Sequence, residues 1–175
     1  MLNPIRSLAL AALAGALIAA PALACPTCSS TSGPPWISIE VPVNPYDPSA
    51  RGAVLLVHTF HHRLPVGALV TGTAEGIVHG ARRSVKLEFQ ETSRAGVYAL
   101  QRSWPKDGTW TLVIQANQGP GDAASAVVDL GPDGEVAAIR VPTTERAGWT
   151  VPAPVALADI DAALRARAAT LARRP

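Results

Sequence analysis

The strongest constraint on this chain is the spacing of its turn-forming residues. From residue 36 to residue 142, Gly, Pro or Asp interrupts the sequence at intervals of about 8 to 12 residues, and β-branched and aromatic residues fill the intervals. Segments of that length hold one short strand and its turn, which is typical of a β-sandwich or barrel. We therefore predict an all-β domain over residues 36–150.

Hydrophobic patterning locates individual strands within this domain. Ile37 and Ile39 alternate with Ser38 and Glu40, so one face of that strand is expected to contact water. The dense apolar run at 53–60 predicts a central strand that is buried on both faces. Further candidates are two short strands at 69–73 and 77–78, separated by Gly72 and Gly76, and an alternating strand at 85–90.

The second half of the domain predicts successive hairpins. We expect a strand from Gly96 to about Arg102, a turn at 104–108 and a returning strand at 109–114. A final hairpin joins 126–130 to 135–141 through Gly131-Pro132-Asp133-Gly134. Hairpins of this kind favour antiparallel pairing, and about seven or eight strands in all suit a sandwich.

The run G-V-Y at 96–98 and the run P-K-D-G-T-W-T-L at 105–112 carry a family resemblance. Together they resemble the closing half of YtkA-like and FixH-like exported domains, and transthyretin-like and carboxypeptidase-regulatory-like sandwiches have a similar strand–turn–strand phrase. The resemblance spans roughly residues 53–117. It implies an immunoglobulin-like antiparallel β-sandwich in a bacterial envelope, loosely associated with metal or respiratory-oxidase functions. It carries over no ligand residues.

Charge and composition exclude two broad classes of protein. Fifteen Lys and Arg residues stand against 13 Asp and Glu residues, for a net charge of +2, which argues against a nucleic-acid binder. Hydrophobic residues make up 48% of the chain and charged residues 16%, which argues against a disordered chain. The length of 175 residues suits one domain, with or without a tail.

Residues 1–24 are expected to form a signal peptide. Arg6 precedes the uncharged run 8–20, Pro21 interrupts that run, and Ala22-Leu23-Ala24 matches the small-x-small pattern of a cleavage site. The run is too short to span a bilayer, which needs about 20 residues. We therefore expect a periplasmic protein with no transmembrane segment in the mature chain. Lipid anchoring at Cys25 is the alternative, although Ala22 and Leu23 stand in the reverse of the usual lipobox order.

Cys25 and Cys28 form a C-P-T-C pair within an expected flexible linker at 25–35. The Ser, Gly and Pro residues that follow the pair do not favour a helix, which a thioredoxin-like dithiol needs at this point. A second C-x-x-C pair, needed for a four-thiolate zinc site, does not occur in the sequence. A local disulfide, a soft-metal site with nearby His and a lipid site all remain open.

The four histidines are the remaining candidate metal ligands. His58, His61 and His62 lie in the run H-T-F-H-H, and His79 follows later. Along a strand His58 and His61 face opposite ways, and His58 and His62 stand about 13 Å apart, too far to share one ion unless the strand bends. We expect a copper or zinc site only if His61 or His62 meets the C-P-T-C segment, or if His58 meets His79 across strands.

The tail predicts a C-terminal amphipathic helix at 155–174. It is Ala-rich, follows Pro152 and Pro154, and carries Asp near its start and Arg near its end. One apolar stripe is expected on it, formed by Leu157, Ile160, Leu164 and Leu171. We expect this helix to dock on the sandwich or to contact an envelope partner protein, and a membrane-surface role is the lesser alternative because the stripe lacks Trp and Phe.

Motifs of the common catalytic classes are missing from the sequence. It contains no G-x-S-x-G, P-loop or H-E-x-x-H run, and nothing in it pairs Glu75 with Glu88. We therefore expect a non-enzymatic accessory or binding protein of the bacterial envelope without a cofactor. The alternative is a periplasmic copper- or zinc-binding protein that uses the His cluster and the C-x-x-C pair.

Overall fold

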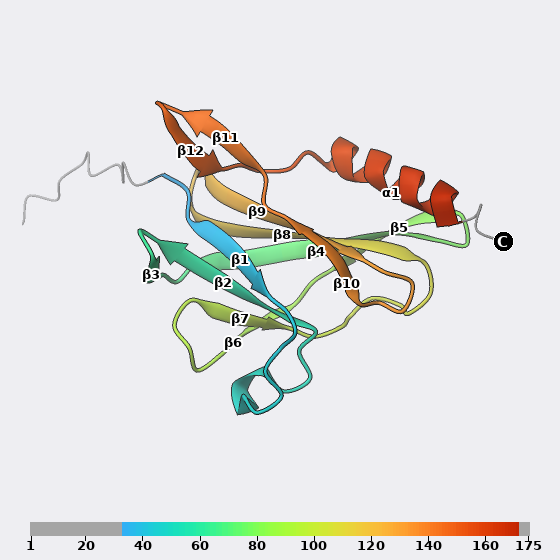
Figure 1. The fold of residues 1–175 in the computed structure, drawn as a ribbon, viewed down its shortest axis with the longest axis horizontal. Coiled ribbons are helices and arrows are strands. Elements are labelled where there is room, and N and C mark those ends of the chain that lie inside the picture. Colours follow the sequence, from blue (N-terminus) through green and yellow to red (C-terminus); the bar gives the residue numbers. More distant parts are fainter. Residues whose placement is uncertain (1–32, 172–175) are drawn as a thin grey trace, which may run out of the picture. The chain divides into compact units, whose positions relative to one another are not determined.

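Two antiparallel β-sheets pack face to face, and a helix covers the outer side of one of them (Figure 1). The computed structural model describes residues 33–171, which belong to one of the two compact units of the chain, 32–175. The expected signal peptide and residues 25–32 of the expected linker lie outside the described residues. The prediction of an all-β sandwich with a C-terminal helix is confirmed.

The first sheet has the strand order β1-β2-β7-β6, and the short β3 forms a hairpin with β2. Its strands are β1 (Trp36–Glu40), β2 (Leu55–His61), β3 (Leu64–Pro65), β6 (Phe89–Glu91) and β7 (Val97–Leu100). Because β2 lies between β1 and β7, the predicted central strand is confirmed. Between β1 and β2 the chain forms a loop with a short 3-10 helix, Pro48–Ala50, which Asp47 caps.

The second sheet has the order β10-β9-β8-β4-β5, and a separate hairpin precedes the helix. The sheet is built from β4 (Leu69–Val78), β5 (Ala81–Lys86), β8 (Thr109–Gly119), β9 (Asp122–Leu130) and β10 (Val136–Arg140), and the hairpin from β11 (Thr143–Arg146) and β12 (Trp149–Pro152). The two sheets thus hold ten described strands, more than the seven or eight expected, because β3 and β6 are only 2 and 3 residues long.

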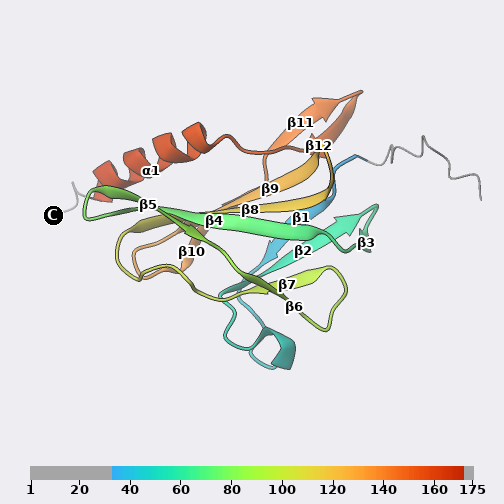
Figure 2. The same ribbon diagram turned by 180° about the vertical axis from the view of Figure 1, so that it is seen from behind.

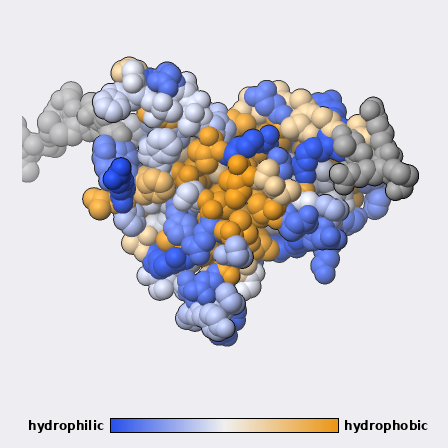
Figure 3. Space-filling model, viewed as in Figure 1, coloured by the Kyte–Doolittle hydropathy of each residue, from blue (hydrophilic) through white to orange (hydrophobic). Residues whose placement is uncertain are grey.

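The core lies between the inner faces of the two sheets. Alternate residues of β8, among them Trp110 and Leu112, point inward and meet Leu55, Val57 and Leu100 of the first sheet. Ile39 of β1 and Val136 of β10 pack against the same core from the sheet edges. Figure 3 shows apolar side chains gathered over the middle of this side of the molecule, where those edges meet. Period-two patterning therefore predicts the core well.

The predicted hairpin at 96–114 is wrong, because β7 and β8 belong to different sheets. The segment 101–108 crosses from the first sheet to the second, and Trp104 within it is buried in the core. A crossing between sheets and a hairpin both need Pro, Asp and Gly, so the turn residues alone do not separate them.

The predicted break at Gly72 and Gly76 is also wrong, since β4 runs continuously from Leu69 to Val78. Gly76 lies opposite Trp110 in the β4–β8 ladder, and a Cβ at this position would collide with the Trp110 indole ring. A Cβ at Gly72 would collide with the Val113 carbonyl oxygen. Both glycines permit close packing within the strand. Close approach of a neighbouring group is a common reason for glycine in a sheet, besides a break or a bulge.

Helix α1 (Leu157–Leu171) lies on the outer face of the second sheet (Figure 2). Ile160 and Leu164, one turn apart, are buried against Val113 and Val127. The helix therefore docks on the sandwich, which is one of its two expected roles. Leu157 departs from the predicted apolar stripe because its side chain is 59% exposed.

Two arginine-centred ion networks hold α1 to the sheet. Arg82 of β5 contacts the buried carboxylate of Glu75 at 2.7 Å and Asp161 of the helix at 2.6 Å. Arg167 of the helix donates to Thr111 Oγ1 at 2.7 Å and to Asp129 Oδ1 at 3.0 Å. Each buried carboxylate of the sheet face thus has a cationic partner, as a low-dielectric site requires. No helix in the described part of the chain is long and apolar enough to cross a membrane.

Candidate ligand-binding groove

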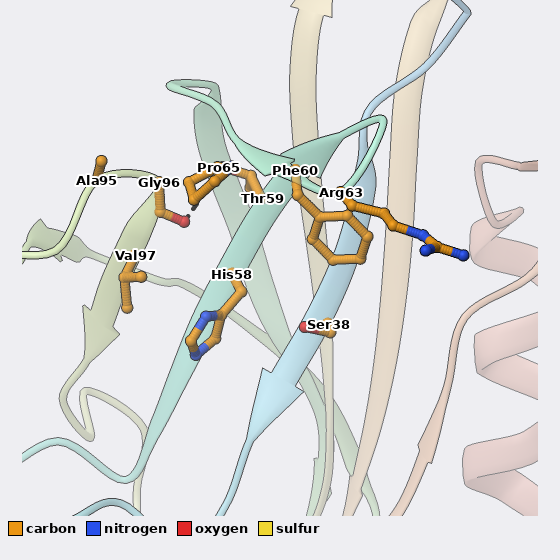
Figure 4. A pocket seen from close by; sticks show the side chains of 9 residues that line it. All are labelled: Ser38, His58, Thr59, Phe60, Arg63, Pro65, Ala95, Gly96 and Val97. Carbon is orange, nitrogen blue, oxygen red and sulfur yellow. Dashed lines mark hydrogen bonds between the residues drawn. The ribbon is translucent and has the colours of Figure 1, made fainter.

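The outer face of the first sheet is only partly covered. Ala50 and Val43 of the loop between β1 and β2 pack over Leu56 and Ala99, which closes one end of this face. At the other end the face is open and forms a groove of about 360 Å³ (Figure 4). We call it the His58 groove; it is lined by Ser38, His58, Thr59, Phe60, Arg63, Pro65 and residues 95–97.

Strand register brings the lining of the groove together. Ser38 of β1 and Val97 of β7 are both register partners of His58, so these three form one row across the sheet. Phe60 pairs with Trp36 on one side and with Pro65 on the other, which forms an apolar row beside the first. Figure 4 shows the His58 ring and the Phe60 ring projecting from the same face of β2. The groove therefore joins an apolar wall to polar groups.

His58 is half-buried and contacts the first of several linked charged side chains. Its Nε2 lies 2.7 Å from Glu40 Oε2, and the Arg94 guanidinium contacts the same Glu40 oxygen at 3.3 Å. Arg94 also contacts Asp47 at 3.6 Å. The Ser49 hydroxyl donates a hydrogen bond to Asp47, and this bond, more than the nearby Arg94 charge, lowers the pKa of the Asp47 carboxyl. Glu40 and Asp47, the two carboxylates beside the groove, therefore share the Arg94 guanidinium as a cationic contact.

Arg63 stands apart from this network. Its side chain runs from the β2–β3 turn past the Phe60 ring towards β1 (Figure 4), and its guanidinium has no acidic partner or hydrogen bond within the described part of the chain. Among the residues that line the groove, Arg63 supplies the one charge that nothing described here balances.

The other predicted ligands are distributed over both sheets. His61 and His62 lie together at the end of β2, with ring centroids 4.4 Å apart, and His61 Nε2 is 3.3 Å from the Gly33 carbonyl oxygen. His79 is exposed at the β4–β5 turn and faces Asp107 at 3.7 Å. It lies at the end of β4 remote from β3, so the structure does not bring it to His58 (Figure 1).

The described residues contain no group of three or more His, Cys, Asp or Glu side chains that could hold a metal ion. Cys25 and Cys28 lie outside the described residues. Sequence reasoning named His58 and missed Glu40, Arg63 and Arg94. Because Glu40 alternates with the core-facing Ile39, the sequence indicated that Glu40 faces away from the core. The contact of Glu40 with His58, however, depends on the β1–β2 register.

No family model matches this chain, and no curated protein or solved structure is significantly similar to it. The resemblance to YtkA-like and FixH-like domains therefore stays a prediction.

Proposed function

We propose that this chain is an exported, non-enzymatic binding protein of the bacterial envelope, and that the His58 groove is its ligand site. The observation that carries the proposal is the groove itself, whose volume of about 360 Å³ lies within the range of about 300–1,000 Å³ that is usual for small-molecule sites. It combines an apolar wall with a few polar groups held by a rigid sheet, which is the usual composition of such sites.

A ligand-detected NMR screen of small organic compounds against the purified protein tests this proposal. Ser38 lies exposed on the groove floor, so the variant Ser38→Trp fills the groove without changing the core. Thr144→Trp, on the exposed strand β11, is the matched control. We expect at least one compound to bind the parent protein and the control but not Ser38→Trp. Compounds that bind all three proteins equally, or none at all, would contradict the proposal.

Export is supported by the composition of residues 1–24, and the compartment has a direct test. We expect the mature protein in the soluble fraction released by osmotic shock, with Cys25 as its first residue. Recovery in the membrane fraction with a blocked N-terminus would favour the lipid-anchored alternative at Cys25.

We also propose that an envelope protein partner binds the C-terminal helix, on the side of the helix that faces away from the sandwich. Because Ile160 and Leu164 face the sandwich, such a partner would contact the outward side of α1, where Leu157 is exposed. A photo-crosslinking residue at position 157 should then trap a defined envelope protein in cells, whereas the same residue at position 144 should not. Equal trapping at both positions would contradict this contact.

The alternative function is copper or zinc binding, and the pairing of His61 with His62 is the observation that favours it. Two imidazole rings 4.4 Å apart offer nitrogen donors, which zinc and copper accept. Cys25 and Cys28 enter this alternative from the sequence alone. His58 and His79 each face one carboxylate instead.

Titration of the reduced protein with Cu(I), Cu(II) and Zn(II) tests the metal alternative. The double variant His61→Ala/His62→Ala and the double variant Cys25→Ser/Cys28→Ser should each weaken binding if the two pairs share an ion, and His79→Ala is the control. Binding weaker than micromolar in the parent protein, or binding that both double variants leave unchanged, would contradict this alternative.

A further inference from the structure

The turn between β2 and β3 differs from the other two-residue turns of the described residues. His62 and Arg63 have φ values of 48° and 69°, the left-handed pair that tight hairpins need. The β4–β5 turn uses His79-Gly80 and the β11–β12 turn uses Ala147-Gly148, with φ values close to these. Glycine stands at the second position of both of those turns, and Arg63 stands there in the β2–β3 turn.

Arg63 therefore occupies a backbone conformation in which glycine would be more stable. A side chain in the left-handed region crowds its own backbone, and residues held in this way gather at sites where the side chain has a role. Fold stability alone does not explain an arginine at position 63, because its guanidinium makes no ion pair or hydrogen bond with the described residues that would offset the backbone strain. The strain points to a role for the side chain outside the fold.

The position of Arg63 indicates that role. The residue lines the His58 groove next to the apolar side chains of Phe60 and Pro65. The other charged groups nearby already have partners, since Glu40 faces both His58 and Arg94. One unbalanced cation beside an apolar wall matches a ligand with one negative charge and an apolar body. A guanidinium binds a carboxylate through two parallel hydrogen bonds.

We propose that Arg63 is held in the strained β2–β3 turn to receive the carboxylate of a small apolar carboxylic acid bound in the His58 groove. This inference rests on the proposed function, that the groove is a ligand site, and it adds the chemical class of the ligand. The single charge of a carboxylate balances the single free guanidinium, and the apolar body contacts the wall formed by Phe60 and Pro65.

The test compares carboxylates with their neutral amides on the full-length mature protein. The probes are benzoate, phenylacetate and hexanoate, each with the amide of the same carbon skeleton, and binding is followed by ¹⁵N–¹H chemical shifts. Arg63→Gly removes both the charge and the strain, and Arg63→Lys keeps the charge. Ala147→Gly relieves the same kind of strain in the β11–β12 turn and is the matched control.

We expect the parent protein to bind at least one carboxylate more tightly than its amide, with shifts centred on residues 58–63 and 95–97. Arg63→Gly should weaken carboxylate binding about tenfold or more, leave amide binding unchanged and raise the melting temperature by roughly 2–4 °C. Arg63→Lys should restore part of the affinity. Ala147→Gly should raise the melting temperature without changing carboxylate affinity.

The failures of the two proposals are distinguishable. If carboxylates and amides bind the groove equally, or if Arg63→Gly binds carboxylates as the parent protein does, the carboxylate inference is wrong and the groove remains a ligand site. If no carboxylate binds, the inference is also wrong, and the Ser38→Trp screen decides on the groove independently. A melting temperature that falls in Arg63→Gly would show that the turn is not strained at Arg63 and would overturn the argument from strain.

Discussion

Single residues of this chain show that glycine has two opposite uses in a sheet. At Gly76 the missing side chain leaves space for the Trp110 ring inside a continuous strand, whereas Gly80 and Gly148 supply the left-handed backbone of tight turns. From sequence spacing alone, both kinds of glycine are predicted to end a strand. The structure separates them, because Gly76 pairs with Trp110 across two strands, whereas Gly80 and Gly148 lie in turns outside the ladders.

Gly76→Ala should destabilise the protein, because the added methyl group collides with a buried ring that is packed on all sides. We expect a loss of about 2 kcal/mol in the free energy of unfolding, the usual cost of overpacking a core. Chemical denaturation measures it. Gly119→Ala is the matched control, since a Cβ there meets open space, and a loss as large in this control would contradict the explanation.

Glu75 gives a prediction for acid stability. Burial by itself raises the pKa of Glu75, but hydrogen bonds from Thr73, Ser84 and Arg82, together with the charge of Arg82, outweigh burial and leave the pKa below its ordinary value. The folded state therefore favours the ionised form. The stability that this provides is complete above the ordinary glutamate pKa and is lost as pH falls through the lowered value.

Glu75→Gln should consequently flatten the fall in stability on the acid side of about pH 4.3 and lower stability near pH 7. Denaturation midpoints measured from pH 7 to pH 2.5 report both effects. The control is Glu88→Gln, which changes an exposed carboxylate in the segment between β5 and β6. If both variants keep the pH profile of the parent protein, Glu75 does not contribute to acid stability.

At the scale of elements, helix α1 is joined to the sandwich by a small apolar contact and by charges on both sides of it. Ile160 and Leu164 form the apolar contact, and the Arg82 and Arg167 networks flank it. Removing one partner of a buried ion pair is costly because the remaining charge stays buried. The helix is thus an integral layer of the fold.

Leu164→Ala should cost about 2–3 kcal/mol of unfolding free energy, as expected for a fully buried leucine at a packed interface. Leu157→Ala makes the same chemical change on the exposed side of the same helix and should change stability by less than about 0.5 kcal/mol. Urea denaturation of both variants measures the difference. Equal effects would mean that α1 does not dock through Leu164.

The elements also show how far the sequence predicts this fold. Period-two alternation identifies β1, and the apolar run at 53–60 identifies β2. Ala-rich composition with flanking prolines identifies α1. These signals depend only on neighbouring residues. The crossing at 101–108 between the two sheets was not predictable in the same way, since hairpins and crossings share turn chemistry. Which strands pair is decided by tertiary packing.

At the scale of the whole molecule, the candidate site depends on register and is therefore harder to predict than the fold. His58 was identified from its place in H-T-F-H-H, but its partner Glu40 lies 18 residues earlier and meets it only because β1 and β2 pair in one register. The groove also needs the 95–97 turn, which comes from a third part of the sequence. A metal-ligand search along the sequence favours His clusters and passes over the isolated Arg63.

The outer faces of the two sheets are covered to different extents. The outer face of the second sheet is covered by α1, and one end of the outer face of the first sheet is covered by the loop that contains Ala50. The His58 groove is the open end of that face, with a half-buried charged network beside it. We propose that the protein binds its ligand at this open end.

The most direct test of this proposal is a chemical-shift map of the protein titrated with phenylacetate and with the compounds found in the ligand screen. We expect the shifted amides to be those of residues 36–40, 58–63 and 95–97, and the amides of α1 and the β11–β12 hairpin to stay unchanged. Shifts concentrated on α1 or on β11 and β12, with the groove amides unmoved, would contradict it.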